Sequence, residues 1–384
     1  MVKISGMEKA LRRPGAFEIG HTDPASAARG GVLWTRHGPV APPVFMPVGT
    51  QGAVKAVAPS ELYEADVGIL LGNTYHLAVR PGIEIVEAAG GLHRFMGWDR
   101  PILTDSGGYQ VFSLAGLRKI GPDGVWFQSH VDGRRLFLGP REAMAIQRRL
   151  GSDIAMVFDE CVPYPSTRDY ACQAVTRTLE WAAACALEAR ADGQLVFGIV
   201  QGGEFGDLRE RCARELRAIG FDGYAVGGVS VGEPGPVLLK GVEDGVRALP
   251  EDRPRYLMGV GLIPQIFEAV ARGVDMFDCV MPTRLARNGS AFTRTGRVPI
   301  KAGRFKADFR PVEEGCVCYA CRHFSRAYVR HLLNAGEILG LRLLTVHNLH
   351  RYMELMRDIR ESLRAGTFAA LKAEWLARYG DDRA

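Results

Sequence analysis

Residues 195–228 read LVFGIVQGGEFGDLRERCARELRAIGFDGYAVGG, and this stretch decides the fold class. It begins with an apolar run that ends in Gln201, continues with a helical pattern over 205–219, and closes with a second apolar run that ends in Gly228. Two short strands joined by a helix are typical of a parallel sheet. The stretch therefore predicts one βαβ unit of an α/β protein.

The same unit recurs along the chain. Short apolar or β-branched runs that end in a polar residue or a glycine occur eight times, mostly followed by a helical pattern. The predicted strands are 44–48, 68–73, 101–105, 153–159, 195–201, 223–228, 255–259 and 275–279, and the helices between them include 140–150, 167–191, 205–219 and 264–272. Eight such units predict a closed (β/α)8 TIM barrel, in which the carboxyl ends of the strands converge on one mouth.

Two regions depart from this alternation before its end. The turn-rich segment 1–43 is expected to form an N-terminal ribbon or cap in front of a catalytic barrel body over 44–282. Apolar residues on both sides of Asp132-Gly133 predict a β-hairpin insertion near 121–138.

After Pro282 the alternation stops. We expect 283–384 to be an appendage that binds zinc, carries positive charge and closes the barrel, with helices near 325–335 and 349–364. The net charge of +5 supports this division, because residues 284–384 hold 19 Lys and Arg against 10 Asp and Glu, whereas the preceding residues hold 29 against 33. A basic segment beside a slightly acidic body is typical of a protein that binds a polyanion, although it also occurs as a solvated helix face.

The composition excludes several classes of protein. The 384 residues are 47% apolar and 24% charged, so disordered, collagen-like and coiled-coil chains are excluded. No stretch of about 20 residues is apolar and free of charge, and the first 13 residues lack an apolar signal core. We therefore expect a cytoplasmic protein without a membrane segment.

Three of the eight cysteines cluster as Cys316-x-Cys318-x2-Cys321, and His347 follows after 25 intervening residues. Three thiolates and one imidazole are a ligand set for tetrahedral zinc, and a closed set of four ligands indicates a structural ion. Other histidines compete for the fourth position: His323 lies too close to Cys321, His331 is a further candidate, and His350 is the alternative to His347.

Polar residues and glycines stand at the carboxyl ends of the predicted strands. They are Asn73, Asp105, Asp159, Glu160, Gln201, Gly228, Gly259 and Asp278. One aspartate after a strand is more often a helix N-cap, but several around one mouth exceed what capping explains. Two carboxylates facing one sugar carbon can cleave a glycosidic bond, one as nucleophile and one as acid and base. A carboxylate with an amide can also bind guanine, on which Tyr109 could stack.

Missing motifs exclude other chemistries. No Gly-x4-Gly-Lys-Ser/Thr sequence marks a P-loop, and Gly259-Val-Gly261 lacks the third glycine of a dinucleotide fingerprint. Asp105-Ser106-Gly107 lacks the preceding glycine of a nucleophile elbow, so Ser106 is a poor nucleophile. No His-x-His follows the first strand, as it does in zinc-hydrolase barrels.

Several longer motifs together resemble one family, the bacterial tRNA-guanine transglycosylases or queuine tRNA-ribosyltransferases. The motifs are FMPVG (45–49), LGNTYH (71–76), FMGW (95–98), ILTDSGGYQ (102–110), FDEC (158–161), YAVGG (224–228), YLMGVG (256–261), DMFDC (275–279), PTR (282–284), RNG (287–289) and the cysteine cluster. They occur in one order and span most of the chain.

The resemblance implies a zinc-carrying (β/α)8 enzyme that exchanges guanine at the wobble position of tRNA without cutting the strand. It assigns Asp278 as the nucleophile that forms a covalent RNA intermediate, and Asp105 as proton acceptor and donor. It implies a base pocket formed by Asp105, Ser106, Gly107, Gly108, Tyr109, Asp159, Gln201, Gly228 and Met258. It implies tRNA contacts from Gly259, Val260, Gly261, Leu262, Ile263, Pro264, Gln265, Thr283, Arg284, Leu285, Ala286 and Arg287. The zinc ligands would be Cys316, Cys318, Cys321 and His347.

The resemblance also implies the partners. They are tRNAs with a GUN anticodon (Asp, Asn, His and Tyr), a 7-deazaguanine base, and a second copy of the chain in a homodimer. Cys161 and Val231 stand where eukaryotic members have Val and Gly, which favours the bacterial substrate 7-aminomethyl-7-deazaguanine over queuine, in queuosine biosynthesis. Two other interpretations stay open: a zinc-stabilised tRNA-binding protein without exchange activity, and a barrel nucleosidase that acts on free nucleosides.

Overall fold

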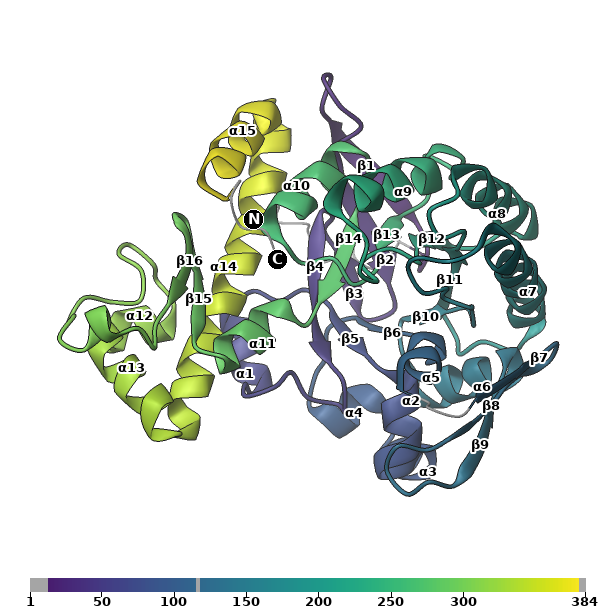
Figure 1. Cartoon of the computed structure of the whole chain (residues 1–384), viewed down its shortest axis with the longest axis horizontal. Helices are drawn as coiled ribbons and strands as arrows, with labels where there is room; N and C mark the ends of the chain where they lie inside the picture. The colour runs from purple at the N-terminus through teal and green to yellow at the C-terminus, as the bar shows by residue number, and fades with distance from the viewer. Residues whose placement is uncertain (1–12, 115–117, 380–384) are drawn as a thin grey trace.

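The computed structural model describes residues 13–114 and 118–379. Eight parallel strands form a closed barrel (Figure 1), which confirms the predicted fold class. They are β4 (Val44–Gly49), β5 (Leu70–Gly72), β6 (Ile102–Thr104), β10 (Ile154–Met156), β11 (Leu195–Val200), β12 (Gly223–Val226), β13 (Arg255–Leu257) and β14 (Met276–Cys279). All eight predicted strands overlap an observed one, because a strand buried on both faces reads as a continuous apolar run.

Helices follow the strands and cover the barrel from outside (Figure 1). They are α1 (Pro59–Glu64), α2 (Thr74–Leu77), the π-helix η2 (Ala78–Gly82), α3 (Ile83–Ala88), α4 (Leu92–Met96), α5 (Gly108–Leu114), α6 (Pro140–Leu150), α7 (Arg168–Leu187), α8 (Gly206–Ile219), α9 (Gly235–Arg247) and α10 (Ile263–Ala271). Local sequence sets their ends: Pro140 starts α6, and Gly151 ends it with a left-handed φ of 71°. Helix α7 ends at Leu187, four residues earlier than predicted.

Two antiparallel sheets are added to the barrel. Strands β1 (Phe17–Thr22), β2 (Arg29–Thr35) and β3 (Gly38–Val40) form the first of these sheets. Strands β7 (Arg118–Gly121), β8 (Gly124–Gln128) and β9 (Arg135–Leu138) form the second, so the region predicted as a hairpin contains one more strand. The pattern missed β7 because its residues Arg118 and Lys119 are exposed and charged.

The region after the barrel lies at one side of it (Figure 1) and has its own small hydrophobic core. It comprises α11 (Met281–Arg287), β15 (Ser290–Thr293), β16 (Gly296–Pro299), the 3-10 helix η3 (Gly303–Phe305), α12 (Tyr319–His323), α13 (Arg326–Ala335), α14 (Ile338–Ala365) and α15 (Phe368–Tyr379). Helix α14 lies between this core and the barrel, and it starts 11 residues before the predicted helix. At Gly340 this helix packs closely against α13, since a Cβ there would lie 2.8 Å from the Leu332 Cβ.

None of the helices within residues 13–114 and 118–379 combines the length and the apolar composition needed to span a membrane.

Candidate active site and metal cluster

The closed barrel brings the predicted site residues to one end. Asp105, Asp159 and Gln201 directly follow or lie close behind the ends of β6, β10 and β11, while Asp278 lies within β14. Since all eight strands are parallel, their carboxyl ends meet at one mouth. The four side chains therefore face a common space.

Asp105 is buried, and all the donors that reach it from the described residues are neutral. Its Oδ1 accepts hydrogen bonds from the backbone N–H of Thr74 at 2.9 Å and of Gly107 at 3.2 Å, and its Oδ2 accepts one from the Asn73 amide. Burial raises the pKa of Asp105 to about 6, against the lowering effect of these hydrogen bonds. The carboxyl group can therefore both release and accept a proton near neutral pH.

Asp159 lies beside Asp105 and is equally buried. Its Oδ2 accepts a hydrogen bond from Gln201 Nε2 at 2.6 Å, and its Oδ1 accepts one from the Ser106 hydroxyl at 3.3 Å. Burial raises the pKa of Asp159 to about 6, and the charges of Asp105 and Glu160 act in the same direction. The charge of Asp105 thus acts on Asp159.

The side chain of Gln201 packs directly against the backbone of Gly228. Gly228 has a left-handed φ of 60°, and a Cβ on it would lie 2.3 Å from Gln201 Oε1. Only glycine fits here. Within the described residues, Gln201 Oε1 is buried without a hydrogen-bond partner, while Nε2 uses one of its two hydrogens on Asp159. The amide oxygen and one amide hydrogen of Gln201 therefore have no partner within the described residues, and recognition of a purine edge requires such groups.

Asp278 has two hydrogen-bond donors, and both reach the same oxygen. Its Oδ1 accepts hydrogen bonds from the Tyr256 hydroxyl at 2.6 Å and from the Gly259 backbone N–H at 2.8 Å. Burial raises the pKa of Asp278, and the two hydrogen bonds oppose this rise. No cationic side chain in the described part of the chain forms an ion pair with it.

The thiols near the mouth are poor nucleophiles. Burial raises the pKa of Cys161 to about 12 and that of Cys279 to about 12, so both remain neutral thiols at neutral pH. The carboxylates are thus the better candidates for covalent chemistry at this site.

Tyr109 and Met258 lie at the opening of the site. Tyr109 is half-exposed, and Met258 is partly buried against the barrel core. The charges of Cys161 and Arg284 act on the Tyr109 hydroxyl, whose pKa is raised by burial. Helix α11, which carries Arg284, therefore approaches the ring that could stack on a base.

The segments expected to contact tRNA contain both exposed and buried side chains. Gly259 and Arg284 are exposed, and Arg287 is partly buried with its Nη1 lacking a hydrogen-bond partner within the described residues. Val260, Ile263 and Ala286 are core residues, so any contact that they make with RNA involves the backbone. The remaining residues of these segments are buried or partly buried: Gly261, Leu262, Pro264, Gln265, Thr283 and Leu285.

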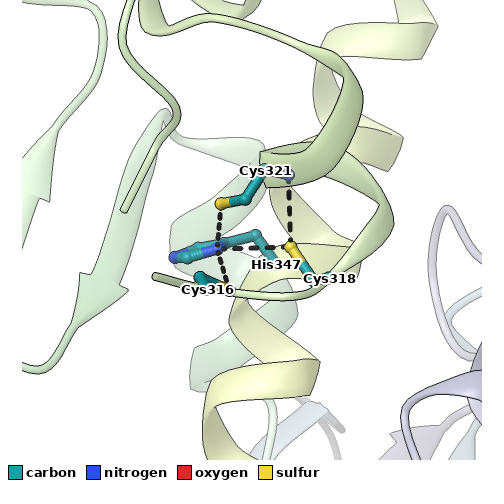
Figure 2. A group of neighbouring side chains, drawn as sticks. All are labelled: Cys316, Cys318, Cys321 and His347. Carbon is teal, nitrogen blue, oxygen red and sulfur yellow. Dashed lines mark hydrogen bonds between the residues drawn. The ribbon is translucent and has the colours of Figure 1, made fainter. Parts of the chain in front are cut away.

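The predicted metal ligands come together in one cluster (Figure 2). The Nδ1 atom of His347 lies 3.7, 3.6 and 3.3 Å from the sulfurs of Cys316, Cys318 and Cys321. An S···N separation of about 3.6 Å corresponds to a tetrahedral zinc with Zn–S and Zn–N bonds of about 2.3 and 2.0 Å. The donor set and its spacing therefore fit a metal ion of this type.

The structure also shows that His347, and not one of the competing histidines, points to the three sulfurs. Its second ring nitrogen, Nε2, lies 2.8 Å from the Phe292 carbonyl oxygen, which orients Nδ1 toward the sulfurs. His350 instead lies with its Nε2 3.7 Å from a carboxylate oxygen of Glu354. The ring of His323 instead contacts Tyr319 in a tilted arrangement and Phe324 edge-on.

Sequence reasoning missed two groups. Tyr256 lies inside β13, where the apolar pattern predicted only a core residue, and no signal in the sequence reveals where its hydroxyl points. At the opposite end of the barrel, His37, His93 and Asp153 form a second compact group of possible ligands. These three residues are so far apart in the sequence that only the fold reveals them.

Comparisons with known proteins agree with this geometry. The family model described as queuine tRNA-ribosyltransferase matches residues 23–381. A queuine tRNA-ribosyltransferase of Pelotomaculum thermopropionicum is 53% identical over 367 residues, which cover 96% of this chain and 99% of the relative. A protein of the same name from Symbiobacterium thermophilum is 54% identical over 94% of this chain and 91% of the relative. One from Staphylococcus aureus is 52% identical over 92% of this chain and 94% of the relative.

Proposed function

This chain belongs to the queuine tRNA-ribosyltransferase family, and from that premise we propose how its barrel mouth acts. The chain is a pentosyltransferase that replaces a guanine of tRNA during queuosine synthesis. We propose that the guanine stands at the wobble position of tRNAs with a GUN anticodon, those for Asp, Asn, His and Tyr. The incoming base would be 7-aminomethyl-7-deazaguanine. The observation that carries the mechanism is the set of three aspartates at one mouth, of which Asp105 and Asp159 are buried and Asp278 is partly buried. Within the described residues, each is held by neutral donors.

In the first half of the reaction, an oxygen of ionised Asp278 attacks C1′ of the ribose. The C1′–N9 bond breaks, its electron pair leaves with guanine, and a proton from Asp105 neutralises the departing base. The RNA is then held as an aspartyl ester. The burial of Asp105 and Asp159 supports this step, because it limits the access of water to the base pocket while the base leaves.

In the second half, the incoming base binds with its N9–H near Asp105. Asp105 accepts that proton, N9 attacks C1′, and the bond between the sugar and Asp278 breaks. A pKa of about 6 suits Asp105 for both directions of proton transfer. The same carboxyl group thus serves both halves.

Base selection would rest on Asp159, Gln201 and Gly228. A carboxylate can accept hydrogen bonds from the ring N–H and the exocyclic amine of guanine, while the free Gln201 amide hydrogen and the Gly228 N–H can donate to its carbonyl oxygen. Tyr109 and Met258 would lie against the two ring faces, with Ser106, Gly107 and Gly108 along the pocket wall. Segments 259–265 and 283–287 would contact the flipped-out anticodon nucleotides.

We further propose that the appendage holds one structural zinc ion through Cys316, Cys318, Cys321 and His347. The ion would fasten α12 to α14 and supply no step of the reaction. We also propose that the chain is organised as an N-terminal ribbon or cap (1–43), a barrel body (44–282) and the appendage (283–384).

A homodimer is also proposed. Val317, Tyr319, Tyr328 and Ile338 are large apolar side chains that are exposed on neighbouring parts of the appendage. Monomeric proteins rarely expose such groups together. A dimer mass in native mass spectrometry, lost in Tyr328→Asp, would support this.

The exchange of labelled guanine into unmodified GUN tRNA tests the proposed reaction. We expect incorporation by the unaltered chain, an RNA adduct on a denaturing gel, and a loss of both by at least about a thousandfold in Asp278→Asn. Cys279→Ala, which alters the neighbouring neutral thiol, should keep the adduct. RNA binding without incorporation would favour the inactive binding protein, hydrolysis of free guanosine would favour a nucleosidase, and an adduct in Asp278→Asn would contradict the assigned nucleophile.

Metal content tests the zinc proposal. Cys318→Ala should lose the ion and lower the unfolding midpoint, since metal binding is coupled to folding. Cys172→Ala changes a partly buried thiol far from the cluster and should retain one zinc per chain. An unchanged midpoint after removal of the metal would contradict a structural role.

A further inference from the structure

The hydroxyl of Tyr256 is a buried group that the proposed reaction does not yet use. Tyr256 is the central residue of β13, and its strand pairs with β14 so that Tyr256 lies opposite Met276. Two residues beyond Met276 is Asp278, and the tyrosine side chain runs up the barrel interior to reach it. The ring is completely buried and packs in the barrel core, which fixes the position of the hydroxyl.

The hydrogen bonds of Asp278 are distributed unequally. Tyr256 and the Gly259 N–H both donate to Oδ1, at 2.6 and 2.8 Å, and no donor from the described residues reaches Oδ2. Two donors on one oxygen fix the rotation of the carboxylate about its terminal bond and leave the other oxygen with its lone pairs available. This is the arrangement that a carboxylate nucleophile needs, since the attacking oxygen must not be engaged.

We propose that Tyr256 is a positioning residue for the nucleophile: its hydroxyl holds Oδ1 of Asp278 so that Oδ2 faces the sugar carbon. This inference rests on the proposed function, because it assumes that Asp278 attacks the ribose. Tyr256 itself does not touch the RNA and transfers no proton.

The surroundings of Asp278 make this hydrogen bond important. Burial disfavours the charged carboxylate, and Tyr256 is the side chain that opposes this effect. The other titratable groups that act on this pair are the carboxyl of Asp105 and the thiol of Cys279, and β4 on the far side contributes Met46 opposite Asp278. None of these is a cation. Burial also raises the pKa of Tyr256 well above its usual value, so the hydroxyl remains a donor throughout the working pH range.

Tyr256→Phe tests the proposal, because it removes the hydroxyl and keeps the packed ring. We expect single-turnover formation of the RNA adduct to slow by roughly 10- to 100-fold, the loss expected for one hydrogen bond to a charged group. The deficit should be greater at acidic pH, because Asp278 becomes harder to ionise and the acid limb moves to higher pH. The KM for tRNA should stay unchanged, since the side chain is buried below the RNA.

Tyr224→Phe is the matched control. Tyr224 is a buried tyrosine of the neighbouring strand β12, but its hydroxyl accepts a hydrogen bond from the Phe221 N–H instead of contacting Asp278. It should leave the rate and the pH profile unchanged. The proposal is overturned if Tyr256→Phe forms adduct at the normal rate, if both variants lose activity equally, or if only the KM changes. An active Asp278→Asn would instead overturn the proposed nucleophile, so the two failures are distinguishable.

Discussion

Both ends of the barrel contain buried aspartates, but these aspartates have different hydrogen-bonding and ion-pair partners at the two ends. At the amino ends of the strands, Asp153 precedes β10 and Asp275 precedes β14. At the carboxyl ends lie Asp105, Asp159 and Asp278. Four of the five are buried and Asp278 is partly buried, so the main difference between the ends lies in their partners.

Asp153 has a full set of donors. It accepts hydrogen bonds from His37 Nδ1 at 2.8 Å, His93 Nε2 at 3.0 Å, and the backbone N–H groups of His37 at 3.0 Å and Ile102 at 2.9 Å. Burial opposes its ionisation, but the hydrogen bonds from His37 and His93 outweigh this and hold the pKa of the carboxyl well below its usual range. The carboxylate thereby fastens the β2–β3 turn and α4 to the barrel.

Asp275 is matched by an arginine. Arg29 donates from Nε at 3.0 Å and from Nη2 at 2.7 Å, and the Arg255 N–H donates at 2.7 Å. The amino-terminal end therefore uses these two acids to hold the N-terminal strands. At the carboxyl-terminal end, Glu160 pairs with Arg177, but Asp105, Asp159 and Asp278 form no ion pair within the described residues. The contrast indicates that stability is built at one end and that reactivity is retained at the other.

Replacing Asp153 by Asn should produce the largest change in stability. An amide cannot accept all four hydrogen bonds, and its own hydrogens would face donors, so we expect a loss of about 3 kcal/mol in the free energy of unfolding. Denaturant titration measures this, with Asp192→Asn, an exposed aspartate, as control. Adduct formation by the folded protein should persist. A variant with normal stability would contradict the contrast between the two ends.

The Asp159→Asn substitution should instead increase the free energy of unfolding. Because the pKa of Asp159 is raised in the folded state to about 6, its ionisation destabilises the fold as pH rises from about 4 to 6, and the full effect is present above that window. Removing the charge should therefore stabilise the protein at pH 7.5 by about 2 kcal/mol, and by less at pH 5. Gln201 can turn its amide to accept from the new Asn. Guanine exchange should be lost, and a decrease in stability at pH 7.5 would contradict the argument.

The pH dependence of the two half-reactions should show the smallest effect. Adduct formation needs Asp105 protonated, so its rate should fall above about pH 6, whereas release into the incoming base needs Asp105 ionised and should slow below that value. Each rate should change by roughly tenfold per pH unit on its own side of the Asp105 pKa of about 6. Single-turnover measurements from pH 5 to 8 check this, with unfolding midpoints as control. Parallel slopes for both halves would contradict the role of Asp105.

Most of the architecture could be predicted from the sequence, because buried parallel strands and capped helices leave strong local patterns. The cysteine cluster was equally visible, since three ligands lie within six residues. The choice of His347 over His350 depends on the helical phase of α14, whose start the sequence placed 11 residues too late. Tyr256 could not be identified, because a buried tyrosine has the same pattern whether its hydroxyl meets a carboxylate or a carbonyl.

The pairing of β14 with β4 has a consequence for how the chain folds during its synthesis. Val44 lies opposite Met276, so the first barrel strand gains its second neighbour only after more than two hundred further residues have been made. Until then β4 has an open edge, and α14, which later packs against it, has not yet been synthesised. The nascent chain is therefore most vulnerable to wrong pairing late in translation, and a chaperone that shields the early strands on the ribosome would act at this stage.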